Sequence, residues 1–318
     1  MVEALETTFQ TICADISLDD IGKLKSLNLS NISLERVDID DFLGFTSLES
    51  LDISGNNIKE LPESFLSLFP NLKELQARSN ILSALPVTGF SKNRKLEWLD
   101  LGQNKLVLLR EDAFSKNRSL RALDLGQNYI EKIPRQIFSN NSSLRSLSLG
   151  ANKISLIELG AFDSLVNLRN LSMYSNELRY LSVGQFDNLE SLEEISFSLN
   201  RITWIPGDVF KNCTRLKRIY LGGNPLRFLP MGLFKGLFLV EEIFLNYLEI
   251  VDLNKSLFHG LPNIKSILLN DNKIKNLHED TFKPGLFNEK AFVNMVRNPL
   301  DNKYKDLVRA QLIERVSF

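Results

Sequence analysis

A pattern of apolar residues and asparagine recurs every 24 residues along this chain, and it constrains the fold more than any other feature. The pattern reads L-x-x-L-x-L-x-x-N-x-L over residues 48–58, with isoleucine or valine sometimes replacing leucine. Ten more copies keep the same 24-residue step and start at Leu24, Leu72, Leu96, Leu120, Leu144, Leu168, Leu192, Leu216, Val240 and Ile264. A degenerate twelfth copy covers residues 293–300. A fixed phase over so many copies indicates a repeat architecture.

The fourth and sixth positions of each copy predict a short strand. In Leu99-Asp100-Leu101 and Leu147-Ser148-Leu149, apolar residues flank a polar one, which is typical of a half-buried strand. A single strand of this kind is not stable alone. Copies stacked in register would form a parallel sheet, and their inner leucines would form one continuous core.

The ninth position of the repeat predicts a ladder of buried amides. Asparagine carries both donors and an acceptor, so it can bridge the backbones of successive turns. Ile32 and Leu248 interrupt this column, the first at an end of the array and the second in its middle. The ladder residues are Asn56, Asn80, Asn104, Asn128, Asn152, Asn176, Asn200, Asn224, Asn272 and Asn298.

A phenylalanine column explains why the chain has 21 Phe but only 6 Tyr and 2 Trp. Phe42 and the residues at 90, 114, 138, 162, 186, 210, 234, 258 and 282 share one position of the repeat, and Phe65 comes one residue early. Aromatic rings at constant phase bury large areas and can stack when they are offset. We therefore expect a buried row of rings beneath the convex side, not a cofactor site.

The two ends predict caps that cover the terminal cores of the array. Val2, Leu5 and Phe9 have helical spacing, and Asp301 can cap a second helix near the other end. That second helix would carry Tyr304, Leu307, Val308 and Leu312 on one face. The predicted division is an N-terminal cap at 1–23, eleven repeats at 24–287, and the degenerate repeat with a helical cap at 288–318.

These motifs resemble the leucine-rich-repeat family from about residue 24 to residue 300. No cysteine follows Asn298-Pro299, and a lone Cys13 precedes the repeats, which is similar to secreted bacterial members with 24-residue repeats. The resemblance implies an α/β solenoid shaped as a horseshoe. Its parallel β-sheet would line the concave face, turns and short 3-10 segments the convex face, and helices the caps.

Composition and charge exclude several classes of function. Lys and Arg number 38 and Asp and Glu 39, so no basic excess favours nucleic acid. No apolar run approaches the roughly 18 residues of a membrane span. The first residues carry no secretory signal, although a chain whose signal had been removed would look the same.

Residues that could carry chemistry are few, so we expect no enzyme, no cofactor and no metal. His259 and His278 fall at different phases of the repeat and do not converge. Cys213 shares its column with leucines, which favours a buried apolar role; the alternative is a catalytic thiol. Cys13 lies several turns away from Cys213, so the two cannot form a disulfide.

An apolar group on the concave sheet is the first candidate for a partner site. Strand residues at the fifth position change from acidic to small to apolar along the array, ending in Tyr220, Phe244 and Leu268. Exposed apolar and aromatic surface marks interaction sites. Coverage by the C-terminal cap or by self-association is the alternative. The apolar group comprises Tyr174, Leu199, Tyr220, Phe244, Tyr247, Leu268 and Phe292.

An acidic group at the other end of the sheet is the second candidate. It would suit a basic partner, and the alternative is a solvated acidic surface interrupted by Arg78. The acidic group comprises Asp52, Glu74, Glu97, Trp98, Asp100 and Asp124.

The sequence thus predicts a non-enzymatic protein- or peptide-binding module that uses its concave sheet. The resemblance implies an exported protein, extracellular or at the cell surface, that acts in recognition or adhesion. The alternatives are a cytoplasmic scaffold or effector, and the recognition arm of an enzyme.

Overall fold

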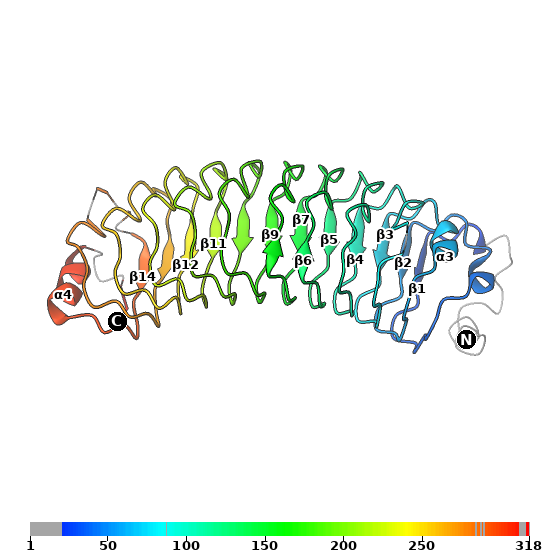
Figure 1. Ribbon diagram of the computed structural model, residues 1–318, viewed down its shortest axis with the longest axis horizontal. Coiled ribbons are helices and arrows are strands. Elements are labelled where there is room, and N and C mark those ends of the chain that lie inside the picture. Colours follow the sequence, from blue (N-terminus) through cyan, green and yellow to red (C-terminus); the bar gives the residue numbers. More distant parts are fainter. Residues whose placement is uncertain are drawn as a thin grey trace.

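The chain forms an elongated, curved coil with one long sheet running along it (Figure 1). The computed structural model describes residues 21–311 except 87, 284, 287 and 289, together with 316–317, and only the backbone of 310 and 311. The elements are β1 Ser26–Asn28, η1 Ile39–Phe42, β2 Ser50–Asp52, α3 Glu63–Ser67, β3 Glu74–Gln76, β4 Trp98–Asp100, β5 Ala122–Asp124, β6 Lys132–Ile133, β7 Ser146–Ser148, β8 Leu156–Ile157, β9 Asn170–Ser172, β10 Glu194–Ser196, β11 Arg218–Tyr220, β12 Glu242–Phe244, β13 Ser266–Leu268, β14 Phe292–Asn294, α4 Asn302–Gln311 and β15 Val316–Ser317.

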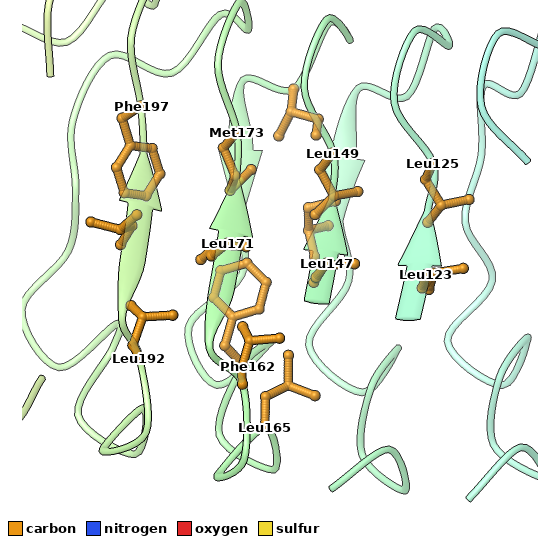
Figure 2. Close-up of a cluster of buried hydrophobic side chains, with 14 of the residues drawn as sticks. Leu123, Leu125, Leu147, Leu149, Phe162, Leu165, Leu171, Met173, Leu192 and Phe197 are labelled. Carbon is orange, nitrogen blue, oxygen red and sulfur yellow. The ribbon is translucent and has the colours of Figure 1, made fainter. Parts of the chain in front are cut away.

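The main sheet is parallel, and its register repeats the 24-residue step of the sequence. In the described residues it has thirteen strands, and Leu51 of β2, for example, lies opposite Leu27 and Leu75. The last step between repeats is longer, because Ser266 of β13 pairs with Phe292 of β14, 26 residues later. The alternating side chains of each strand point into one continuous apolar core, which Figure 2 shows for the middle of the array.

The phenylalanine column forms the other wall of this core. The ring centroids of Phe90, Phe114, Phe138, Phe162 and Phe186 lie 6.2–6.3 Å apart from one turn to the next. Hydrogen-bonded strands lie only about 4.8 Å apart. The turns are therefore wider on the phenylalanine side, which places the main sheet on the concave face and the rings beneath the convex face.

The convex side consists mostly of turns, as the sequence predicts, with two differences. One is the five-residue α-helix α3. Strands β6 and β8 pair in parallel, and an isolated bridge joins Tyr180 to Trp204 at the same repeat position two and three turns further on. The pair β6–β8 is thus a second, two-stranded sheet on the outside of the coil, and the bridge repeats its position two turns later. The repeat pattern did not predict either feature.

The ladder asparagines link successive turns through their side-chain amides. Asn152 is typical: its Nδ2 donates to the carbonyl oxygens of Leu125 and Leu149, and its Oδ1 accepts from the N–H of Ile130. All three bonds are 3.0 Å long. Each amide therefore supplies hydrogen bonds to buried backbone groups of the neighbouring turns.

The break in the ladder at Leu248 has a local explanation. The Oδ1 of Asn272, in the next turn, accepts from the N–H groups of both Leu248 and Ile250. The N–H of Leu226, which an asparagine at 248 would serve, donates instead to the carbonyl oxygen of Asn224 at 2.9 Å. The backbone is satisfied without a ladder amide, so a buried leucine can occupy the position.

A second row of buried asparagines lies on the convex side, in the column that also contains Cys213. The Nδ2 of Asn117 donates to the carbonyl oxygens of Phe90 and Asn93, and Asn141 repeats the arrangement one turn later. Asn93 makes the same pair of bonds one turn earlier. The sequence analysis did not single out this row, although its 24-residue phase was readable.

The C-terminal end of the core is covered by α4 and β15. Val308 of α4 is buried and Tyr304 packs against the core, while Val316 of β15 pairs with Val293 and so continues the sheet. Leu307 is half-buried, and Leu312 lies outside the described residues. At the other end, Ile21 and Leu24 pack on the core, and the rest of the expected N-terminal cap, with Cys13, falls outside the described residues.

Candidate functional site: the concave sheet

The register of the main sheet aligns the fifth repeat position into one row across the concave face. Tyr220, Phe244 and Leu268 are direct neighbours on β11, β12 and β13. All three are half-buried, because their flanks pack against one another while their outer edges face solvent.

Tyr220 and Phe244 form the most distinctive feature of this surface. Their rings stack with centroids 4.3 Å apart and planes at 17°. Burial raises the pKa of the Tyr220 hydroxyl, and the neighbouring carboxylate of Glu194 raises it further. The ring pair is therefore a preformed flat apolar platform whose single hydroxyl stays protonated.

Three other members of the apolar group lie on turns or strands near this platform. Leu199 and Tyr247 lie in the left-handed turns that follow β10 and β12, with φ of 57° and 56°, and both side chains are exposed. The Tyr247 hydroxyl takes part in the network of Asp271 and Arg297. Phe292 begins β14 and is also exposed.

Tyr174 does not join the platform. A Cβ atom added to Gly150 would lie 2.2 Å from Cε1 of Tyr174, so this ring lies over the preceding turn and away from Tyr220. The structure thus brings together the strand residues of the apolar group and leaves Tyr174 apart.

A hollow of about 260 Å³ adjoins the platform on the concave face. Tyr220 and Glu194 line one side, and small polar residues of β7, β9 and β10, including Ser148, Ser172 and Ser196, line the rest. The small residues in the middle of the fifth-position row therefore create a depression beside the aromatic rings.

The acidic group has a local structural role that the sequence analysis missed. The carboxylates of Asp52, Asp100 and Asp124 each accept the N–H two residues further on, at 2.7–2.9 Å. Asn28 and Asn294 make the same bond at the two ends of the sheet. A side chain that caps the turn after each strand gives these positions a reason to be Asp or Asn without any partner.

Arg78 neutralises part of the acidic group. Its guanidinium lies 3.3 Å from Asp124 and 4.0 Å from Asp100, and a Cβ at Gly102 would meet Nη1 of Arg78 at 2.6 Å. Burial raises the pKa of Asp100, with further contributions from Asp124 and Asp52, while Arg78 opposes the shift. The central acids are thus paired and partly desolvated.

The remaining members of the acidic group are spread along the edge of the sheet. Glu97 pairs with Arg121 at 3.3 Å, and Glu74 accepts from Ser50 and Gln76. Trp98 is exposed at the start of β4. Most carboxylates of the acidic group thus have hydrogen-bond or ion-pair partners within the chain, and the group does not form a continuous negative surface.

The described residues that could carry metal or thiol chemistry lie apart from one another or are buried. They contain no cluster of three or more His, Cys, Asp or Glu that could hold a metal ion. Burial raises the pKa of the Cys213 thiol to about 12, so it stays protonated, and it donates only to the carbonyl oxygen of Phe186. Within the same part of the chain, no helix has the length and apolar character needed to cross a bilayer.

Stacked 24-residue turns with a parallel sheet, an asparagine ladder and a buried phenylalanine row define a leucine-rich-repeat solenoid. The sequence matches family models described as leucine rich repeat at residues 47–68, 70–130, 118–178, 167–226, 190–247 and 215–274. These matches cover well over half of the chain, and it belongs to the leucine-rich-repeat family. No curated protein sequence matches the chain significantly.

Solved structures share this fold at low sequence identity. A chain of the Drosophila Toll–Spatzle complex superposes with a TM-score of 0.78 at 24% identity, over 94% of this chain and 40% of that one. An internalin from Listeria monocytogenes gives 0.68 at 19% identity, over 100% of this chain and 94% of that one. A chain of the octameric complex of Latrophilin 3, Unc5D and the FLRT2 leucine-rich repeat gives 0.70 at 24% identity, over 80% and 77%. This chain therefore spans less than half the length of the Toll chain.

Proposed function

We propose that this chain is a non-enzymatic binding module that holds a protein or peptide on its concave sheet, with the stacked Tyr220–Phe244 pair as the main contact. Two aromatic rings presented side by side on a rigid sheet contribute little to folding at their outer edges. Rigid aromatic anchors dominate the binding energy of protein interfaces. The stacked pair at 4.3 Å is the observation that carries this proposal.

The hollow beside the pair extends the surface available to a partner. A side chain that rests on the rings could place its neighbour among the serines of β7, β9 and β10. Two of the solved structures with this fold were determined as complexes with proteins, Toll with Spatzle and FLRT2 with Latrophilin 3 and Unc5D.

The location and role we propose are extracellular or cell-surface recognition or adhesion. The likeness of the repeats and their ends to secreted bacterial leucine-rich-repeat proteins supports this proposal, and a cytoplasmic scaffold is the alternative.

Capture of partners on immobilised protein tests the concave site. The double variant Tyr220→Ala/Phe244→Ala removes both rings, and we expect it to lose at least tenfold of the captured partner, identified by mass spectrometry. The matched control is Phe238→Ala/Leu239→Ala, which removes two exposed apolar side chains outside the concave strands. Equal capture by the wild type and the concave double variant, with unchanged thermal unfolding, would show that the site is wrong.

A further inference from the structure

A second apolar surface lies on the outside of the coil and is separate from the concave site. One residue per turn forms what we term the outer row: Lys132, Leu156, Tyr180, Trp204, Phe228 and Asp252, each 24 residues after the last. Its four central members are large, apolar and 41–64% exposed. Three residues further on, Leu159, Val183 and Met231 form a parallel exposed row, in which Gly207 stands between Val183 and Met231.

The backbone holds these side chains on one face. Lys132 lies opposite Leu156 in the β6–β8 pair, and Tyr180 is bridged to Trp204. The residue that follows each member points the other way: Ile133, Ile157, Leu181, Ile205 and Leu229 are all buried. The members of the outer row therefore face outward from the core, and folding alone does not require them to be apolar.

The extent of this surface matches that of a stable interface. At these exposures each side chain presents on the order of 100 Å². The seven apolar side chains of the two rows together approach the roughly 800 Å² that each partner contributes to a standard interface. Exposed apolar side chains gathered over an area of this size mark an interaction site.

The order of residues along the outer row indicates what covers it. Between Lys132 and Asp252 the column reads basic, four apolar, acidic, an order that is complementary to itself when reversed; one turn before Lys132, the same column carries the exposed Leu108. Lys132 pairs with Glu158 within the chain, while the Asp252 carboxylate accepts only the N–H of Leu253 among the described residues. Asp252 is therefore available for a cation from outside.

We propose that a second copy of this chain binds here, related by a two-fold axis that lies in the interface, crosses the outer row at right angles and passes between Tyr180 and Trp204. Tyr180 of each copy then packs on Trp204 of the other, Leu156 on Phe228, and Lys132 pairs with Asp252. In the parallel row Leu159 meets Met231, and Val183 packs on the flat surface at Gly207. A Cβ at Gly207 would lie 2.6 Å from the carbonyl oxygen of Met231, so this position must stay flat.

Such a dimer is joined through its convex sides and leaves both concave sheets open. The self-association surface and the concave site are then independent. A failure of one proposal leaves the other standing.

Sedimentation velocity on the full chain, up to about 100 µM, tests the dimer. We expect the wild type to form dimers and Trp204→Glu to be monomeric, because the substitution buries charge at the axis. Asp252→Lys should weaken the dimer about tenfold by facing Lys132 of the second copy. Adding Lys132→Glu to that variant should restore the dimer by reversing the pair.

The control is Phe238→Glu, which charges an exposed phenylalanine outside both rows and should leave the dimer unchanged. Circular dichroism melting shows whether each variant is folded. A monomeric wild type, or a dimer that survives Trp204→Glu, overturns the proposal. If the double charge reversal fails to restore the dimer, the two-fold arrangement is wrong.

Discussion

At the scale of single residues, the ladder asparagines show which features of the structure one column of the repeat can predict. A polar residue at a buried phase predicts that an amide serves the backbone, and Asn152 does so with three hydrogen bonds. The adaptation at Leu248 could not be predicted. It depends on one acceptor atom of Asn272 taking two N–H donors and on a local bond between Leu226 and Asn224, neither of which leaves a mark in the sequence.

The ladder gives the first stability prediction. Asn152→Ala should lower the free energy of unfolding by about 1–3 kcal/mol. The substitution leaves the buried N–H of Ile130 without its acceptor, and it removes one of the two amide hydrogen bonds to each of the carbonyl oxygens of Leu125 and Leu149. Urea unfolding followed by circular dichroism measures the change. Lys153→Ala, an exposed neighbour, is the control and should change stability by less than about 0.5 kcal/mol. Equal midpoints for both variants would contradict the role of the ladder.

Leu248→Asn tests the explanation of the break. The N–H and carbonyl groups that a new amide would serve already have partners, so the variant gains no bond and loses the burial of a leucine. We expect it to destabilise the fold by about 1.5–3 kcal/mol in the same urea experiment. A variant more stable than the wild type would show that the turn lacks a hydrogen bond.

The charged residues beside the strands give a pH prediction. Hydrogen bonds from Lys73 and then Lys25 lower the pKa of Glu49 to about 2, with nitrogen–oxygen distances of 2.5 and 3.0 Å. The pKa of Glu49 is lower in the folded chain than in the unfolded chain. The contribution of these lysine–Glu49 pairs to folding stability is therefore complete above the ordinary pKa of about 4.3, and it is lost as the pH falls through about 2. NMR titration of the Glu49 carboxyl should give this pKa, and Lys73→Met should raise it. A midpoint near 4.3 in the wild type would contradict the pairing.

At the scale of elements, the phenylalanine row supports the convex side much as the strands support the concave side. Phe138 lies between Phe114 and Phe162, with ring centroids 6.3 Å away on both sides, and it is fully buried. Phe138→Ala should therefore cost about 3–5 kcal/mol, the range for a buried ring replaced by a cavity. Phe238→Ala, at an exposed ring, is the matched control. A loss below 1 kcal/mol at Phe138 would mean that the row is not part of the core.

The elements also divide into those that the sequence predicts and those that it does not. Every strand of the main sheet from β1 to β13 follows from the repeat, since Leu51 and its equivalents alternate with polar residues. The pair β6–β8 was missed because each strand has only two residues, too few to show an alternation, and because the outward residue of β8, Leu156, is apolar. Apolar residues on both faces hide the alternation by which a half-buried strand is recognised.

At the scale of the whole molecule, each turn packs mainly against its two neighbours, so mutations in distant turns should have independent effects on stability. Asn152 and Asn176 donate to the same carbonyl oxygen, that of Leu149, at 3.0 Å each. The double variant Asn152→Ala/Asn176→Ala should therefore differ from the sum of its single variants by more than 0.5 kcal/mol. Asn56→Ala/Asn272→Ala, at opposite ends of the array, should be additive. Additive losses for the adjacent pair would contradict the coupling through the shared oxygen.

The candidate site was predictable to the extent that it follows from the register. The order of the fifth column places Tyr220 beside Phe244, but the stacking of their rings at 4.3 Å depends on side-chain rotation. Tyr174 leaves the group because Gly150 gives its ring space on the preceding turn. Asp52, Asp100 and Asp124 were interpreted as a site for a basic partner or as solvated surface charge. The hydrogen bond that each carboxylate accepts from the N–H two residues further on became visible only in the structure.

The parallel register at a constant step has a consequence for how such a chain can change in length. Deleting or duplicating one whole 24-residue unit within residues 144–191 would present each new neighbour with the same backbone donors and acceptors as before. The distance between the aromatic pair at Tyr220 and the acids around Asp100 would then change by one strand spacing, about 4.8 Å, while both retain their own surroundings. The number of turns therefore sets the distance between these two surfaces, and a partner that contacts both would bind only at the matching number of turns.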